Sequence, residues 1–203
     1  MNAPDFPYMP HTPHTPHALA PALAAALLAV AWLPALADQK LLPAQSEISF
    51  TSRQMGVPVD GKFRKFDAQV AFEPKQPEAA KIGFTVDLAS ATLGLPETDA
   101  ELAKPDWFDT RRFPQATFQS SGVKATGPGK FEVMGKLAIK SISRDVVVPV
   151  TLAQAGGQTT AAGTFVIKRL DFRIGDGDWK DTSMVADAVQ VRFKLVLTGV
   201  GPL

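Results

Sequence analysis

Two acidic clusters contain the residues whose types and spacing could do chemistry. Asp106 and Asp109 flank Trp107-Phe108, and such a carboxylate pair could hydrolyse a glycan if a polar cleft held the two acids about 5 to 10 Å apart. Three positions apart on a short helix, they fit surface and capping roles more simply. The segment 175–181 (GDGDWKD) resembles a calcium loop but lacks the third paired acid, the sixth-position glycine and the closing glutamate. We therefore expect a solvated loop with a packed Trp179.

The residue types that are missing narrow the chemistry further. No cysteine is present, and the tyrosine and all three histidines lie before residue 18 (Tyr8, His11, His14 and His17). Residues 38–203 therefore offer no Ser-His or Cys-His nucleophile pair and no imidazole or thiolate metal ligand. We expect a protein that is not an enzyme, with no catalytic residues, no cofactor and no metal site.

The N-terminal region has the pattern of a secretory signal. Residues 18–33 form an apolar run without a charge, and Ala35-Leu36-Ala37 offers small residues at a cleavage site. The run is shorter than the roughly 20 residues of a membrane span. The absence of Lys and Arg before Ala37 departs from the usual signal. We expect a signal peptide at 1–37, a mature domain at 38–203 beginning with Asp38, and a periplasmic location.

The charge balance argues against nucleic acid as a partner. Lys and Arg number 21 against 20 Asp and Glu, a formal net charge of +1, and no clustered basic face suggests nucleic-acid binding. Four basic residues fall at strand ends, where we expect them to face solvent or to form a rim for an anionic head group: Lys140, Arg144, Lys168 and Arg169.

Alternating apolar and polar residues predict the elements that must position any site. Eight antiparallel strands are expected at about 46–53, 57–73, 82–88, 116–123, 131–139, 146–152, 161–167 and 189–197. Gly61 is expected to mark a bulge at which the second strand bends. Eight strands suit a closed barrel, and a two-sheet sandwich of the immunoglobulin kind is the alternative.

One stretch, 97–121, interrupts this alternation. Pro96 and Pro105 favour helical starts, with Thr98 or Asp99 as a cap, and Pro114 ends the helical pattern. The sequence therefore predicts an all-β domain with one short helical insertion.

The number of phenylalanines is the compositional feature that stands out. All but one of the 13 Phe follow Ala37, many on the alternating strand faces. A packed core and a cavity for a long hydrocarbon ligand account for this equally well. The residues that we expect to line the interior are Phe50, Phe66, Val70, Phe72, Phe84, Phe118, Phe131, Val133, Phe165 and Phe193.

An ordered set of short motifs through residues 41 to 199 resembles the YceI family. The motifs are GKFRKF at 61–66, Phe72-Glu73-Pro74, DWFD at 106–109 with Phe113-Pro114 and Phe118-Gln119-Ser120, and GKLAIK at 135–140 with Arg144-Asp145-Val146. Each is weak alone, and the ordered set is specific. Leu41-Leu42-Pro43, Gln54 and Ser141 depart from the family's usual residues.

The resemblance implies a lipocalin-like, eight-stranded antiparallel barrel in the periplasm that holds a polyisoprenoid, such as a quinone tail or a prenyl lipid. By analogy it also implies a cytochrome b561-like membrane partner, and a homodimer is a further expectation. A structural or stress-related interaction protein with a packed barrel is the alternative, and a hydrolase that uses only carboxylates is a weaker one.

Overall fold

The computed structural model describes residues 38–203, so the expected signal peptide, 1–37, lies outside the described residues. Within 38–203 no helix is long and apolar enough to cross a membrane. The strands are β1 (Lys40–Leu41), β2 (Glu47–Gln54), β3 (Val57–Phe63), β4 (Phe66–Ala71), β5 (Lys81–Asp87), β6 (Ala91–Thr92), β7 (Gln115–Gly127), β8 (Lys130–Ile139), β9 (Ile142–Ala155), β10 (Gln158–Lys168) and β11 (Ala188–Thr198).

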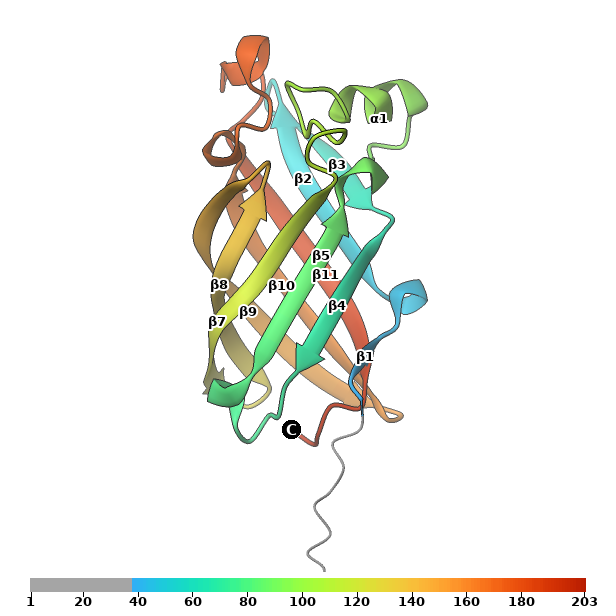
Figure 1. Ribbon diagram of the computed structural model, residues 1–203, viewed down its shortest axis with the longest axis vertical. Coiled ribbons are helices and arrows are strands. Elements are labelled where there is room, and N and C mark those ends of the chain that lie inside the picture. Colours follow the sequence, from blue (N-terminus) through green and yellow to red (C-terminus); the bar gives the residue numbers. More distant parts are fainter. Residues whose placement is uncertain (1–37) are drawn as a thin grey trace, which may run out of the picture. The chain divides into compact units, whose positions relative to one another are not determined.

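One curled antiparallel sheet contains all of these strands, in the order β4-β5-β7-β8-β9-β10-β11-β2-β3-β6, with β1 on β11. It wraps around a long interior as a half-barrel (Figure 1). Tight turns join several pairs of neighbouring strands. The turn residues Met55, Gly56, Gly156 and Gly157 have positive φ, as two-residue hairpins require. A single sheet rules out the two-sheet sandwich.

The strand count differs from the predicted eight because the expected strand 57–73 is two strands. The β2–β3 register runs without interruption from Gln54↔Val57 to Ile48↔Phe63, so Gly61 is not a bulge. The chain breaks instead at Arg64-Lys65, where it leaves β2 and joins β5. The inward face changes there from odd to even positions, from Phe63 to Phe66. The two-residue strands β1 and β6 complete the eleven.

Short segments cover the two edges that this break leaves. At one end β6 pairs with β3 through Lys62↔Thr92 and Phe63↔Ala91. At the other end the Gln39 side chain donates to the Phe72 carbonyl (2.7 Å) and accepts from its amide (3.0 Å). A side-chain amide thus replaces one rung of the missing ladder, which limits edge-to-edge pairing with other chains.

The sheet also has a seam between β9 and β10. These strands pair only from Gln158↔Ala155 to Ala162↔Thr151, although both continue well beyond. Pro149 lies two residues past the last pair and has no N–H to donate, so proline normally occurs where a ladder is absent. The upper part of β9, from Ile142 to Val150, is therefore paired only with β8.

Irregular segments cover one end of the sheet, which we call the mouth end; the C-terminus lies at the other end, the base (Figure 1). Helix α1 (Pro96–Leu102) begins at Pro96, as expected, but its N-cap is Leu95, with no side-chain cap. The Asp99 carboxylate instead accepts from the Leu93 amide, 2.7 Å away. The expected helical turns at Trp107 and Phe108 are hydrogen-bonded turns in which both rings are buried.

The second part of the mouth end comes from the chain between β10 and β11. It contains the 3-10 helices η4 (Arg169–Phe172) and η5 (Gly177–Lys180) and a loop through 181–187. Leu102, Trp107 and Phe108 share one core cluster with Phe172 and Val185. Packing between these two segments therefore forms the mouth end.

Candidate ligand cavity

An apolar cavity of about 430 Å³ occupies the interior of the sheet. Val189 and Leu197, eight positions apart on β11, both line it, so it extends for roughly 27 Å at about 3.4 Å per residue. The volume lies within the usual range for ligand pockets, and the length favours a chain-like molecule. An interior of this kind is not the filled core of the packed-barrel alternative.

The predicted lining residues lie where the alternation places them, with one exception. Phe66 packs with the cluster around Ile48 and Leu195 and is not among the cavity-lining residues. The others all line the cavity: Phe50, Val70, Phe72, Phe84, Phe118, Phe131, Val133, Phe165 and Phe193. Whether they bind a ligand stays a prediction.

Three inward-facing glycines leave room for phenylalanine rings close to the wall. A Cβ at Gly61 would lie 2.3 Å from the Phe50 ring, one at Gly135 2.4 Å from Phe118, and one at Gly163 2.5 Å from Phe193. Contacts this short do not occur, so a side chain at any of them would displace a ring. At Gly135 and Gly163 it would also meet backbone, the Gln119 carbonyl at 2.5 Å and the Pro149 carbonyl at 2.2 Å. The glycines therefore keep the interior open, and Gly135 causes no change of face on β8.

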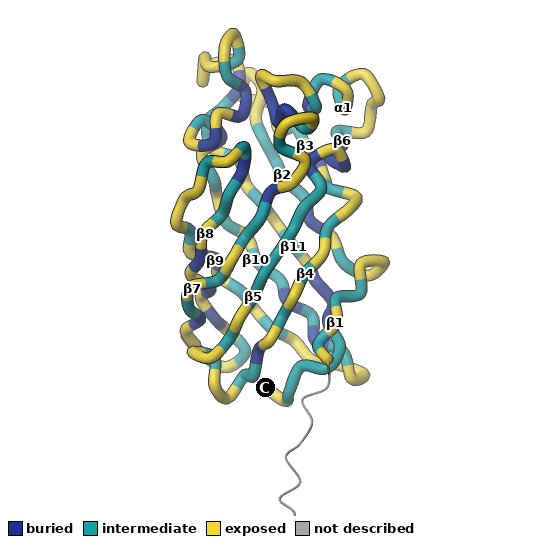
Figure 2. Tube along the Cα trace, viewed as in Figure 1, coloured by how far each residue is buried: buried dark blue, intermediate teal, exposed yellow. Residues whose placement is uncertain are grey.

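The polar residues of the cavity wall lie at the mouth end. They come from β2, α1 and η4: Ser52, Gln54, Thr98, Glu101 and Arg169. Gln54 is exposed, and Thr98 and Glu101 are half-buried, so the cavity reaches solvent at this end. Figure 2 shows exposed segments at this end, α1 among them. None of the five was predicted to line the cavity, although Thr98 was expected as a helix cap and Arg169 as a strand-end cation, because polar side chains at the ends of strands and on short helices are ordinary.

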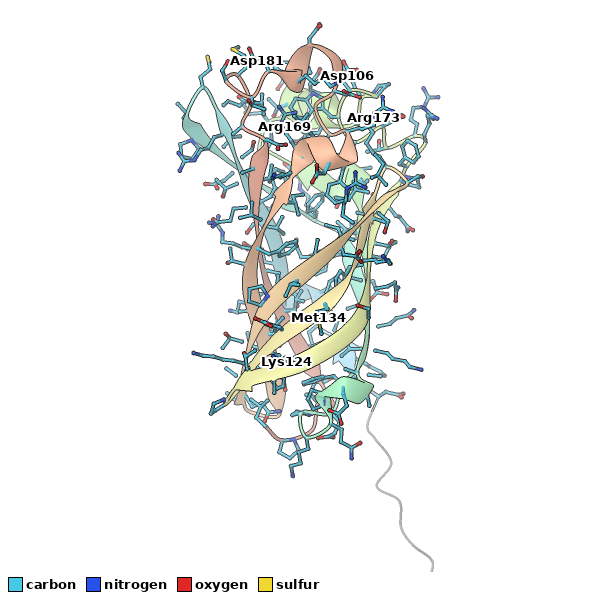
Figure 3. The ribbon with its side chains drawn as sticks, turned by 90° about the vertical axis from the view of Figure 1, so that its left-hand side faces the viewer. Asp106, Lys124, Met134, Arg169, Arg173 and Asp181 are labelled. Atoms are coloured by element: carbon cyan, nitrogen blue, oxygen red, sulfur yellow. The ribbon has the colours of Figure 1, made fainter. Side chains whose placement is uncertain are left out.

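Arg169 is the most deeply buried of them, at 1% exposure. Burial lowers the pKa of its guanidinium, while Asp187 acts in the opposite direction. Figure 3 shows Arg169 at the mouth end, far from Lys124. All five of its N–H groups donate to backbone carbonyls, at 2.7 to 3.1 Å: those of Ala186, Ile174, Gly175, Trp179 and Val185.

Lys140 has the same role from the tip of the β8–β9 turn. Its Nζ donates to the carbonyls of Pro105 (2.9 Å), Trp107 (2.7 Å) and Arg173 (2.8 Å). Burial lowers the pKa of this ammonium, partly offset by Asp109 and Asp176. The expectation that Arg169 and Lys140 face solvent or form a rim for a head group is therefore wrong, because backbone carbonyls use their donors. Arg144 and Lys168 are exposed to solvent, as expected.

The acidic residues at 106–109 and in the 175–181 loop make local contacts. The Asp109 carboxylate lies 3.5 Å from Arg112, and neither Asp109 nor Asp106 lines the cavity. In the 175–181 loop, Asp176 accepts from the Arg173 Nε at 2.9 Å, which holds the pKa of this carboxyl below its usual range. Residues 38–203 contain no cluster of three or more metal-ligating side chains.

Hydrocarbon and side-chain amides close the base of the cavity. Phe72 and Phe131 meet edge to face, with ring centroids 5.1 Å apart, in a cluster with Val123, Val133 and Val148. The Gln154 amide donates to the Gly201 carbonyl (2.7 Å) and accepts from the Leu203 amide (3.1 Å), which ties down the C-terminal segment.

Comparison with known proteins agrees with this geometry. A family model described as a YceI-like domain matches residues 40–197, so the chain belongs to the YceI-like family. A UPF0312 protein of Azotobacter vinelandii is 34% identical over 88 residues, 43% of this chain and 46% of that protein. The chain thus spans less than half the length of that relative. A UPF0312 protein of Vibrio cholerae is 28% identical over 157 residues, 72% of this chain and 83% of that protein.

Solved structures extend the likeness to the fold. The crystal structure of Burkholderia cenocepacia BcnA is 46% identical, with a TM-score of 0.75 that covers 77% of this chain and 98% of that one. A polyisoprenoid binding domain from Saccharophagus degradans has a TM-score of 0.64 at 13% identity and covers 79% of this chain and 98% of that one. At that identity the second likeness shows the fold alone.

Proposed function

We propose that this chain binds a long-chain polyisoprenoid, such as a quinone tail or a prenyl lipid, and carries it without catalysing a reaction. The apolar cavity of about 430 Å³ is the observation that carries the proposal. Each CH₂ group buried there contributes about 0.8 kcal/mol of binding free energy. The S. degradans domain, which has the same fold, is described as a polyisoprenoid binding domain.

The lining also supports a binding role over a catalytic one. Glu101 is the only carboxylate among the cavity-lining residues of 38–203, whereas hydrolysis with carboxylates needs two. Ser52, Gln54 and Thr98 could hydrogen-bond a polar head group at the mouth end while the tail extends toward Phe72 and Phe131.

A titration followed by tryptophan emission tests the proposal. Trp107 and Trp179 both line the cavity, with ring centroids 5.5 Å apart. Delipidated protein titrated with a long isoprenoid or quinone should change emission saturably, near one ligand per chain. Phe84→Glu should weaken this response strongly, because a charge in the cavity costs desolvation energy. Lys194→Glu, on the outer face, is the matched control.

Circular dichroism must first show that both variants fold. The carrier proposal fails if no long-chain isoprenoid gives saturable uptake, and mass spectrometry of lipids extracted from natively purified protein would identify the cargo.

Location and partners are further parts of the proposal. A periplasmic carrier requires removal of residues 1–37, and intact-mass measurement of exported protein should give Asp38 as the first residue. A cytochrome b561-like membrane partner rests on the resemblance to the YceI family, and a homodimer is a separate expectation. Co-purification and sedimentation equilibrium test them.

A further inference from the structure

The mouth end exposes large apolar side chains at the entrance to the cavity. Met55 (71% exposed) and Val57 (63%) lie on the β2–β3 turn, Leu95 (60%) at the start of α1, and Met184 (46%) in the loop before β11. We call these four residues the rim. Each belongs to a segment that also contributes to the cavity wall, through Gln54, Val59, Thr98 and Val185. The exposed apolar side chains of the rim are therefore close in sequence to residues of the cavity wall, of which Gln54 and Thr98 are polar and Val59 and Val185 are apolar.

The backbone of the rim is already hydrogen-bonded. The Met55 amide donates to the Met184 carbonyl (2.8 Å), and the Ala186 amide donates to the Arg53 carbonyl (2.9 Å). The Arg53 side chain folds back on the turn and donates to the Gly56 carbonyl at 3.1 Å. Such a turn can enter a poorly hydrated layer at low cost, because unpaired backbone groups are what make entry expensive.

We propose that the rim docks on the surface of a zwitterionic lipid bilayer, so that the cavity entrance faces the lipid chains. This inference rests on the proposed function, because an isoprenoid cargo has to be collected from, or delivered to, a lipid phase. The long apolar side chains of Met55 and Leu95 can enter the head-group layer, where Arg53 can keep its charge in water while its stem packs against lipid.

Charge near the rim decides the kind of bilayer. Helix α1 carries Glu97, Asp99 and Glu101 and no basic residue. The segment 176–181 carries three aspartates and a single lysine. Arg64 and Lys104 pair with Asp99 and Glu101 of α1, and Arg173 and Lys180 pair with Asp176. Each segment together with these partners keeps one net negative charge, so a zwitterionic surface suits the mouth end better than an anionic one.

The test compares rim and wall residues of matched exposure. The double variant Met55→Ser, Val57→Ser, which we call the rim pair, alters the rim. The double variant Val147→Ser, Val166→Ser, which we call the wall pair, alters valines that are 55% and 59% exposed on the outer wall. In flotation with phosphatidylcholine vesicles, the rim pair should lower the bound fraction at least about tenfold, and the wall pair less than about twofold, because only the rim side chains leave water. Vesicles rich in phosphatidylglycerol should bind wild type more weakly.

A fluorescent label at the rim reports directly whether the rim enters the bilayer. The chain contains no cysteine, so Met55→Cys and Val166→Cys each take one polarity-sensitive fluorophore. Vesicles should shift the emission of the label at 55 to the blue and leave the label at 166 unchanged, whatever residues 1–37 contribute to binding. Equal behaviour of the two labels, or of the two serine pairs, overturns the inference.

Two further measurements separate the competing outcomes. If sedimentation shows a dimer that the rim pair dissociates, without a label shift on vesicles, the rim is an interface between two copies and the inference fails. Uptake of isoprenoid from detergent micelles should be the same in the rim pair and in wild type. If the wild-type protein takes up no isoprenoid from micelles, the proposed carrier function is refuted instead.

Discussion

The two ends of the barrel-like sheet are closed by different chemistry. At the base, two-residue turns join β7 to β8 and β9 to β10, the longer segment 72–80 joins β4 to β5, and the Phe72–Phe131 cluster closes the cavity. At the mouth end, the irregular segments 103–114 and 169–187 leave carbonyls without ladder partners, and Arg169 and Lys140 bind eight of them between the two side chains. Regular structure can be closed with hydrocarbon, whereas irregular structure needs buried donors to satisfy its backbone.

The largest effect should come from Arg169→Met. It leaves five buried carbonyls without a donor, which should lower the free energy of unfolding by about 3–5 kcal/mol. Chemical denaturation measures the loss, and hydrogen exchange should show it in 169–187 before the base. Arg192→Met, on the outer wall, is the control. A loss below about 1 kcal/mol would show that the mouth end does not depend on this cation.

Phe131→Ala probes the base. Removing this ring should cost about 3 kcal/mol of unfolding free energy, the lower end for buried Phe because the residue already borders a cavity. Exchange protection should fall around Phe72 and Val123 and stay unchanged in 169–187. Equal loss of protection at both ends would mean that the two ends are not independent.

Two variants of the β8–β9 turn separate the effect of backbone strain from the effect of the Lys140 hydrogen bonds. Lys140 and Ser141 both have positive φ, 50° and 62°, a region that favours glycine. Ser141→Gly should therefore stabilise the fold by about 0.5–1 kcal/mol. Lys140→Gly relieves the same strain but loses three hydrogen bonds, so it should destabilise by about 1–2 kcal/mol. Opposite signs in thermal unfolding would confirm the role of Nζ, and equal signs would contradict it.

Acid should produce the smallest effect and weaken only the mouth end. A hydrogen bond with Arg173 lowers the pKa of Asp176, bonds from Thr92 and Leu93 lower that of Asp99, and bonds from Ser183 lower that of Asp181. A lowered carboxyl pKa contributes stability above the unfolded value and loses it as the pH falls through the folded value. Below about pH 4, NMR amide signals of α1 and 173–184 should broaden before those of the base.

The residues that face the cavity could be predicted from the sequence, because they follow local periodicity. The role of Arg169 could not, because it depends on the carbonyls around it. Alternation placed Val189, Val191 and Phe193 on the cavity face, because neighbouring residues in a strand point to opposite sides. The break at Arg64-Lys65 has no glycine or proline to mark it, so two strands looked like one. Arg169 looked like an ordinary strand-end cation, because its five partners are fixed only by the tertiary structure.

The seam between β9 and β10 gives the wall an elastic property. Where the ladder stops at Thr151↔Ala162, the sheet can widen without breaking a hydrogen bond between these strands. The other long neighbours resist such widening; β10 and β11, for example, are paired over eleven positions. The circumference is therefore adjustable along this seam, which begins at Pro149, as well as along the gap between β3 and β4, and this would let one wall fit cargoes of different girth.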